Sequence, residues 1–505
     1  MSGSIPEILA EALRSGEVSD REAFYKLKMR LCSQYGPHHV PANSEIIALL
    51  DDEERKRFHT ILVKKPVKDA SGVAAVAVMT SPYPCPHGKC AYCPGGVAEK
   101  SSQSYTGKEP AARRATSNRF DPYDQTLSRV TQMEDTGHDA SRVDLIIMGG
   151  TFTSRQRQYQ EWFVKRCFDA LNGCDSPDLE TAKTINAESE HRVVGLTVET
   201  RPDYFTKKSQ IDEMMSLGAT RVELGVQILD DGILEKVDRG HGVKEVAEAT
   251  SACLDAGLSV CYHLMPGLPG SSPEHDIECF RKVFDDPAFR PDNLKFYPVL
   301  VVGDTELARM WRDGEYTPPD LETTADLLTK MKLMVPPYAR IQRIQRDIPV
   351  SEITCGITNS NMRQIVQRRM AEAGLKCRCI RCREAFRTGA EPADPSGLPG
   401  DFIYEASGGT EHFLSYETGD ALIAYLRLRT DGSDTARIRE VKVTGSGPDG
   451  WQDRGYWEAL VSYAEKLASS QGASVIRATC GPGARGIYSE LGYVYEAPYM
   501  VHRLH

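Results

Sequence analysis

Short apolar runs alternate with amphipathic stretches across the middle of the chain, from residue 73 to residue 335. The runs are rich in β-branched residues, and polar helical patterns separate them. This alternation is typical of parallel strands joined by helices that cover the sheet. The sequence therefore predicts an α/β fold whose sheet is open or closed into a barrel. The predicted strands are 73–79, 143–150, 193–199, 221–227, 258–265 and 294–302, and the predicted helices include 157–173 and 243–257.

Polar residues gather where these predicted strands end. The carboxyl ends of parallel strands face the active site of an α/β protein, so we expect these residues to line one site. Glu199, His263 and Lys295 are candidates for polar contacts in the mouth of a barrel, and Lys295 is a candidate catalytic residue. Each of the three could equally have a structural role. The other polar strand ends are Arg201, Glu223, Gln227 and the sequence Gly149-Gly150-Thr151.

Three cysteines stand close together just after the first predicted strand: Cys85, Cys90 and Cys93, spaced C-x4-C-x2-C. Three thiolates can hold three irons of a [4Fe–4S] cluster and leave the fourth iron open to a small ligand. Such an open iron is used to cleave S-adenosylmethionine (SAM) reductively into an adenosyl radical. The alternative is a zinc knuckle with a distant fourth ligand, for which His87 is the local candidate. The position after a strand, with Gly-Gly-Thr ending the next strand, favours the iron–sulfur interpretation.

A second group of cysteines, Cys377, Cys379 and Cys382, has the spacing C-x-C-x2-C. In a reducing compartment, tight clustering of this kind indicates a metal site. Cys355 is the candidate for a fourth ligand. Arginines surround the group within 363–387 and form a basic patch, although the net charge of the chain is −10. This patch and a second one at 55–68 can bind a polyanion, although a solvated helix face has the same sequence pattern.

The length of the chain and its two ends set further limits. By ordinary domain sizes, 505 residues are enough for roughly two to four domains. No apolar run approaches the roughly 18 residues that span a bilayer, and the N-terminus has a polar helical pattern, not that of a signal peptide. We therefore expect a cytoplasmic protein with helices over residues 5–60 and no membrane contact. The stretch 391–401 predicts a linker, and the strands and the helix at 455–472 that follow it predict a second, α+β domain.

A series of motifs runs in order along the chain. It begins with KPVKDASGVAAVAVMTSPYPCPHGKCAYCPGG and MGGTF, continues with GLTVETRPDY and DRGHGVKEVAEATSACLDAGLSVCYHLMPGLPGS, and ends with KCRCIRCRE, YEASGGTEHFLSYE and LGYVYEAPYM. Each motif is weak alone, but the ordered set is highly specific. This set resembles the family of Elongator catalytic subunits, and the resemblance covers essentially the whole chain.

The resemblance implies both a fold and an activity. The fold is a radical-SAM partial (β/α) barrel fused to an α+β domain of the GCN5-related acetyltransferase type, with an N-terminal helical segment. The activity is the formation of 5-carboxymethyluridine at uridine 34 of tRNA, from acetyl-CoA and by SAM-derived radical chemistry. The expected parts are an N-terminal tRNA-binding region at 1–72, the radical-SAM domain at 73–335, a basic zinc-binding linker at 336–392 and the acetyltransferase domain at 393–505.

The resemblance also assigns roles to residues. Cys85, Cys90 and Cys93 would hold the cluster, and Gly149, Gly150 and Thr151 would lie along the methionine end of SAM. Zinc would be held by Cys377, Cys379 and Cys382. Acetyl-CoA would contact Arg142, where the family has a lysine, and Tyr488 is a catalytic candidate near the thioester sulfur or else a core aromatic. The pantetheine arm would lie along Glu440, Val441, Lys442 and Val443, and the pyrophosphate would lie at the turn 452–454 and at Gly455, Tyr456, Trp457 and Glu458.

The implied partner is the anticodon stem-loop of tRNA, while partner subunits and a homodimer are both left open. Trp457 stands where the family has a glycine, and a large side chain there puts acetyl-CoA binding in doubt. Two other functions therefore stay open. One is a protein lysine acetyltransferase with the iron–sulfur domain as a scaffold. The other is a tRNA-binding subunit that binds acetyl-CoA weakly.

Overall fold

The computed structural model describes residues 4–35, 40–63, 71–390, 395, 397–445 and 455–504. Parts of three sequence expectations lie outside these residues: 64–68 of the second basic patch, most of the first half of the linker, and the turn 452–454. Within the described parts of the chain, no helix is both long enough and apolar enough to cross a membrane.

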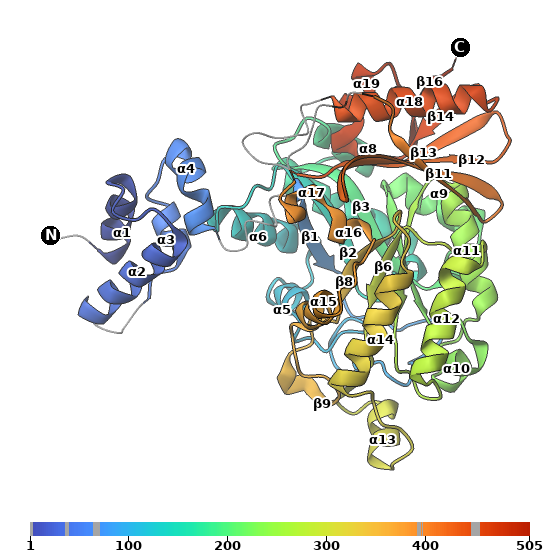
Figure 1. Cartoon of the computed structure of the whole chain (residues 1–505), viewed down its shortest axis with the longest axis horizontal. Coiled ribbons are helices and arrows are strands. Elements are labelled where there is room, and N and C mark those ends of the chain that lie inside the picture. Colours follow the sequence, from blue (N-terminus) through green and yellow to red (C-terminus); the bar gives the residue numbers. More distant parts are fainter. Residues whose placement is uncertain are drawn as a thin grey trace.

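The N-terminal helices form a lobe to one side of the rest of the chain (Figure 1). Leu13, Phe24 and Ile46 belong to its apolar core. At the start of the fourth helix, Asp51 and Glu54 cap each other, since each side chain accepts a hydrogen bond from the other's backbone N–H. The helical prediction for this region is confirmed. The helices are α1 (Ile5–Arg14), α2 (Arg21–Tyr35), α3 (Asn43–Ile47) and α4 (Asp52–Leu62).

Seven parallel strands form the central sheet, and its two edges are the first and the last of them. The sheet is therefore a curved half-barrel that is open between these edges, which we call the seam (Figure 1). β-branched and other apolar side chains such as Val76, Leu145 and Val222 fill its core. The strands are β1 (Ala74–Met79), β2 (Arg142–Met148), β3 (Arg192–Thr200), β4 (Arg221–Gln227), β5 (Ser259–Leu264), β6 (Asn293–Phe296) and β8 (Arg340–Ile344).

The α/β prediction is confirmed, with two differences in its strands. The run predicted as one strand at 294–302 divides into β6 and the short β7 (Val301–Val302), which pairs with β9 (Ile353–Cys355) in a separate sheet. The seventh strand of the half-barrel, β8, comes from the segment that we expected to be a linker. Helices connect the strands: α5 (Pro110–Ser117), α6 (Pro122–Asp135), α7 (Arg157–Asn172), α8 (Leu179–Asn186), α9 (Lys208–Leu217), α10 (Asp231–Lys236), α11 (Val243–Asp255), α12 (Pro273–Asp285), α13 (Glu306–Arg312) and α14 (Leu321–Met334).

After β8, a helical segment leads to a second seven-stranded sheet, which is mostly antiparallel. The long helix α18 (Tyr456–Ser470) packs on this sheet, as predicted for an α+β domain. The helical segment holds α15 (Met362–Glu372), α16 (Ile380–Arg383) and α17 (Ala385–Thr388). The other elements are β10 (Gly400–Ala406), β11 (Gly409–Thr418), β12 (Ala421–Thr430), β13 (Thr435–Val443), β14 (Val475–Ala478), α19 (Arg485–Glu490), β15 (Val494–Glu496) and β16 (Tyr499–Arg503).

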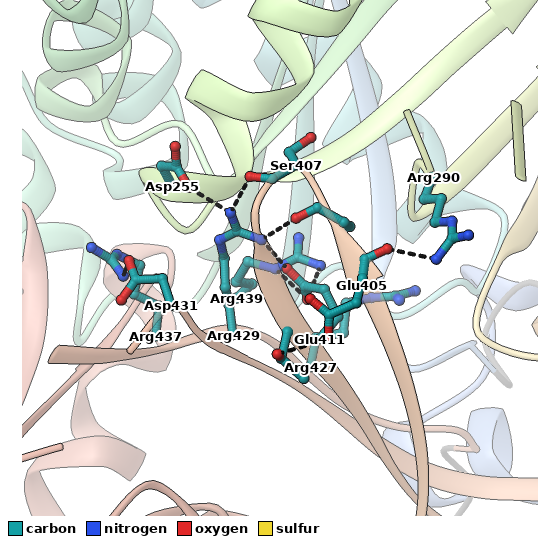
Figure 2. Close-up of polar contacts among 12 residues, drawn as sticks. Asp255, Arg290, Glu405, Ser407, Glu411, Arg427, Arg429, Asp431, Arg437 and Arg439 are labelled. Carbon is teal, nitrogen blue, oxygen red and sulfur yellow. Dashed lines mark hydrogen bonds and ion pairs between the residues drawn. The ribbon is translucent and has the colours of Figure 1, made fainter. Parts of the chain in front are cut away.

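Ion pairs whose arginines are buried join the second sheet to the amino-terminal end of the half-barrel (Figure 2). Both Nη atoms of Arg439 lie 2.8 Å from the carboxylate of Asp292, the residue before β6. Arg439 also donates to Glu411 at 2.7 Å. Arg429 donates to Asp255, at the end of α11, over 2.6 Å. These contacts hold the two sheets against each other, so side chains of both can line one cavity.

Candidate functional site

A cavity of about 1550 Å³ extends through the half-barrel. Its lining includes Cys85, Cys90 and Cys93, which follow the carboxyl end of β1, and polar side chains of β3 to β6. The lining also includes Lys442 of β13, in the second sheet. Lys442 lies near Arg340, the first residue of β8, which places it at the amino-terminal ends of the barrel strands. One cavity therefore connects the cysteine loop with the second domain.

The three cysteines are held in a network of polar contacts. His87 lies between two of the thiols, with Nδ1 3.1 Å from Sγ of Cys85 and Nε2 3.1 Å from Sγ of Cys90. Gln103 donates from Nε2 to Sγ of Cys93 over 3.2 Å. The structure thus brings all three predicted cluster ligands to the lining of one cavity.

Two arginines set the charge around these thiols. Nη1 of Arg239 lies 3.6 Å from Sγ of Cys90, and Arg201 donates to the carbonyl oxygen of Arg239. Burial, with the positive charges of Arg201 and Arg239, lowers the pKa of His87 to about 3, so its imidazole is neutral. Burial raises the pKa of the Cys93 thiol, so binding of iron would have to displace its proton. Three cysteines in the lining of one cavity are the donor set of a [4Fe–4S] cluster that leaves its fourth iron open.

The turn after β2 lies directly beside the cysteine loop. Gly149 and Gly150 have φ angles of +123° and +94°, a region that side chains other than glycine rarely adopt. A Cβ atom on Gly149 would lie 2.4 Å from Oγ1 of Thr80, so the space is closed to any side chain. Oγ1 of Thr151 is 3.4 Å from Sγ of Cys85. The turn therefore packs closely against Thr80 beside the cysteine loop, and Gly150 and Thr151 line the cavity.

Three ionisable side chains from adjacent strands meet in the cavity: Glu223 of β4, His263 of β5 and Lys295 of β6. The carboxylate of Glu223 accepts from Nε2 of His263 over 2.7 Å and forms an ion pair with Lys295. Burial would raise the pKa of Glu223, but Lys295 and His263 outweigh it and hold that pKa well below its usual range. The predicted residues Lys295 and His263 are thus brought together, whereas Glu199 accepts separately from the hydroxyl of Tyr105.

The second group of cysteines forms a compact sulfur site. The Sγ atoms of Cys377, Cys379 and Cys382 all lie within 4.8 Å of one another. Hydrogen bonds from the other two thiols and the charge of Lys332 lower the pKa of Cys382, which favours its thiolate. Three converging sulfurs suit one tetrahedral ion. Cys355 is not part of this group: it pairs with Val301 between β9 and β7, and the structure does not support it as the fourth ligand.

The residues expected at the acetyl-CoA site fall in two places in the second domain. Gly455 precedes α18 with a φ of +75°, and Tyr456, Trp457 and Glu458 form its first turn. The ring of Trp457 packs edge-on against that of Tyr488 at 5.7 Å, so the unexpected tryptophan contacts the catalytic candidate. Burial raises the pKa of Tyr488 well above its usual value, so its hydroxyl keeps its proton.

The expected pantetheine platform, Glu440 to Val443, forms the end of β13. The carboxylate of Glu440 already accepts from Nε of Arg427 over 2.9 Å, so this side chain is occupied. Lys442 faces the main cavity instead. Arg142 begins β2 in register with Arg192, and the backbone of Arg192 lies against Gly483 of the second domain. Arg142 is thus near the junction of the domains, on the opposite side of the half-barrel from the cysteines.

The seam carries an excess of positive charge. The cavity lining there includes arginines of α5, α6 and β8, with Arg381 of α16. Burial and the neighbouring guanidinium groups of Arg363 and Arg340 lower the pKa of Arg381 to about 9. No carboxylate among the described residues forms an ion pair with Arg381. The arginines of the lining along the seam are Arg113, Arg114, Arg129, Arg340, Arg343, Arg381 and Arg387.

Sequence reasoning missed several residues that shape this site. Arg239 stands beside Cys90, and Gln103 and Tyr105 contact Cys93 and Glu199, yet none of the three belongs to a predicted strand end or cysteine group. Arg113 and Arg114, on α5, were missed as well. Arg239 belongs to the DRGHG motif, but the motif alone does not indicate that this arginine contacts a cysteine.

Comparisons with known proteins agree with this arrangement. Three family models match: the Radical SAM superfamily at residues 81–283, the Radical_SAM C-terminal domain at 291–372 and the ELP3 N-terminal domain at 2–70. The chain is 44% identical to the tRNA uridine(34) acetyltransferase of Methanocaldococcus jannaschii, over 98% of this chain and 96% of that protein. It is 37% identical to Elongator complex protein 3 of Drosophila melanogaster, over 98% of this chain and 95% of that protein. A solved structure of Methanocaldococcus infernus Elp3 lacking its N-terminus is similar, with a TM-score of 0.76 and 41% identity over 86% of this chain and all of that one.

Proposed function

Because the chain belongs to the Elongator complex protein 3 family, whose relatives include tRNA uridine(34) acetyltransferases, we propose that it converts uridine 34 of tRNA to 5-carboxymethyluridine with acetyl-CoA. The observation that carries this proposal is the single cavity lined both by Cys85, Cys90 and Cys93 and by Lys442 of the second domain. An acetyl group presented by the second domain could reach the cysteine end without leaving the protein.

The match to the Radical SAM superfamily makes the protein a radical-SAM enzyme, and the cysteine site fits its cluster. When bound, a [4Fe–4S] cluster and SAM supply an adenosyl radical that can remove a hydrogen atom from a methyl group. Cys85, Cys90 and Cys93 would hold the cluster. Gly149, Gly150 and Thr151 would lie along the methionine end of SAM, which the place of Gly150 and Thr151 in the cavity lining supports.

We propose that the second domain has the GCN5-related acetyltransferase fold and would present acetyl-CoA. Support comes from the start of α18, which follows a glycine with positive φ, since the N-terminus of a helix is a suitable site for a pyrophosphate. Arg142, the end of β13 and Tyr488 would contact the rest of the cofactor. Trp457 places a large side chain in the first turn of α18, where the family has a glycine. The proposal therefore allows acetyl-CoA to bind more weakly than it would with a glycine at this position.

We assign tRNA binding to the seam, the N-terminal lobe and the zinc knuckle. The arginines that line the seam would contact phosphates. A zinc ion held by Cys377, Cys379 and Cys382 would fix the segment that carries two of these arginines, Arg381 and Arg387. The four parts at 1–72, 73–335, 336–392 and 393–505 and a cytoplasmic location are part of the same proposal. Partner subunits or a second copy could add to the tRNA site.

Replacing Arg381 with glutamine should weaken tRNA binding about tenfold at low salt and reduce the salt dependence of binding by about one phosphate contact. The reason is that other arginines surround Arg381 and that no carboxylate among the described residues forms an ion pair with it. A phosphate bound at Arg381 would therefore be strongly stabilised by the surrounding positive charge. Filter binding across a salt series measures both quantities. Arg157→Gln is the matched control, because Arg157 lies on α7 and already pairs with Glu161 at 2.8 Å. Equal affinities for the two variants would contradict the assignment.

The proposed function is tested by anaerobic reconstitution with SAM, methyl-labelled acetyl-CoA and unmodified tRNA. Mass spectrometry of the nucleosides should show 5-carboxymethyluridine at position 34 with the label in the new side chain. The matched substrate control is the same tRNA with cytidine at position 34. Unmodified uridine 34 combined with SAM cleavage onto another substrate would refute the proposal. Acetylation of lysine peptides without SAM would favour the lysine acetyltransferase.

A further inference from the structure

The carboxylate of Glu223 orients the ring of His263 within the cavity. His263 donates from Nε2 to Glu223 over 2.7 Å, and Lys295 forms an ion pair with the same carboxylate oxygen. The side chain of Glu223 is only 1% exposed, whereas those of His263 and Lys295 are 13% and 11% exposed. All three groups line the cavity, and the carboxylate is the most buried of them.

This contact fixes the tautomer of a neutral His263. Glu223 is ionised, because Lys295 and His263 hold its pKa low, and an ionised carboxylate only accepts hydrogen bonds. The ring proton must then be on Nε2, which leaves the lone pair on Nδ1. Nδ1 makes no hydrogen bond with any described residue. A carboxylate that orients an imidazole with a free ring nitrogen is the arrangement of a general base.

The proposed reaction needs such a base inside the half-barrel. The carbon that bonds to uridine is the methyl carbon of the acetyl group, and the thioester carbonyl is attached directly to it. After the carbon–carbon bond has formed, the acetyl group is attached to the uridine through its methyl carbon and is still joined to CoA as a thioester. The thioester carbonyl is next to the new bond and so lies in the same part of the cavity. Tyr488 is 1% exposed in the core of the second domain and offers no base there.

We infer that His263 is the general base that hydrolyses this thioester, with Glu223 as its positioning residue; the inference rests on the proposed function. Nδ1 of His263 takes a proton from water as the water oxygen bonds to the carbonyl carbon. Lys295 faces the resulting oxyanion with its positive charge. The carbon–sulfur bond then breaks, and the imidazolium returns the proton to the CoA thiolate. The second proton of the water is lost when the new carboxylic acid ionises.

The test compares the wild-type holoenzyme with His263→Gln, whose side-chain amide can still donate to Glu223. Wild-type enzyme should release CoA and leave carboxymethyluridine. The variant should instead accumulate tRNA that carries the CoA thioester, which hydroxylamine cleaves to a hydroxamate, and CoA release should fall about 10²–10⁴-fold. Glu223→Asp, which keeps the charge but withdraws it from the ring, should accumulate the same thioester.

Two comparisons separate this role from loss of the fold or of the whole reaction. His275→Gln is the matched control, because His275 also contacts a carboxylate, that of Asp230 at 3.2 Å, but lies outside the cavity lining. The His275→Gln variant should behave as the wild type.

The second comparison uses cluster-free protein and tRNA that carries a preformed CoA thioester. The wild-type protein should hydrolyse the thioester and the His263→Gln variant should not, while the two proteins have the same melting temperature. Carboxymethyluridine at the wild-type rate from His263→Gln, or SAM cleavage without any thioester, overturns the inference. Absence of carboxymethyluridine from the wild type refutes the proposed function, and this inference with it.

Discussion

Replacing Cys85, Cys90 or Cys93 with serine should remove the iron from the protein and leave its zinc in place. Wild-type protein reconstituted without oxygen is expected to hold about four irons and about one zinc per chain. Each of the three thiols lines the main cavity, and serine is a poor ligand for iron, so each loss should bring the iron content close to zero. SAM cleavage should become undetectable. Metal analysis with absorbance near the iron–sulfur bands measures the effect directly.

The reciprocal substitutions provide the control. Serine at Cys377, Cys379 or Cys382 should remove zinc and leave the iron, because these sulfurs form a separate group within 4.8 Å of one another. His87→Ala should keep the iron, since the imidazole contacts thiols and is not needed as a ligand of the cluster. If His87→Ala loses a zinc and no variant loses iron, the first cysteine group is a zinc knuckle.

The half-barrel and its cysteine loop could be predicted from the sequence because the signals are local. Apolar runs of strand length are buried on both faces of a parallel sheet and stand out against the helices between them. The spacing of Cys85, Cys90 and Cys93 is local in the same way, and the Gly149-Gly150 turn matches the φ angles that the structure requires. These features need no knowledge of contacts between distant residues.

The parts that could not be predicted depend on distant contacts. The strand β8 reads Arg-Ile-Gln-Arg-Ile, with too many charges to resemble a buried parallel strand, and its arginines are accommodated because it is an edge beside the seam. Arg427, Arg429 and Arg439 look like solvated residues of surface strands but are at most 2% exposed in the structure. Their partners Asp255 and Asp292 lie more than a hundred residues earlier, so nothing in the local sequence indicates their burial.

Replacing Asp292 with asparagine should destabilise the protein by about 3–5 kcal/mol, because it leaves buried guanidinium groups without their counter-charge. Asp292 is fully buried, accepts from Arg439 at 2.8 Å on both oxygens and lies 3.2 Å from Arg427. Asparagine has nearly the same shape, so the loss comes from charge and not from packing. Urea denaturation followed by fluorescence measures it. Arg503→Gln is the control, since Arg503 pairs with Glu496 on the surface and its loss should change little.

The ionisation of Asp292 should make the stability of the domain junction depend on pH. Burial would raise the pKa of Asp292, but Arg439 and Arg427 together lower it to about 2. An unfolded aspartate has a pKa of about 3.9, so the folded state binds the proton less readily and the carboxylate stabilises the fold above that pH. This stabilisation should be lost as the pH falls from about 4 towards 2. Asp292→Asn cannot titrate, so its stability should depend less on pH across that interval than the wild type's. The measurement is the free energy of unfolding of the two proteins between pH 4 and pH 2. The same dependence on pH in both would show that the junction does not depend on this ion pair.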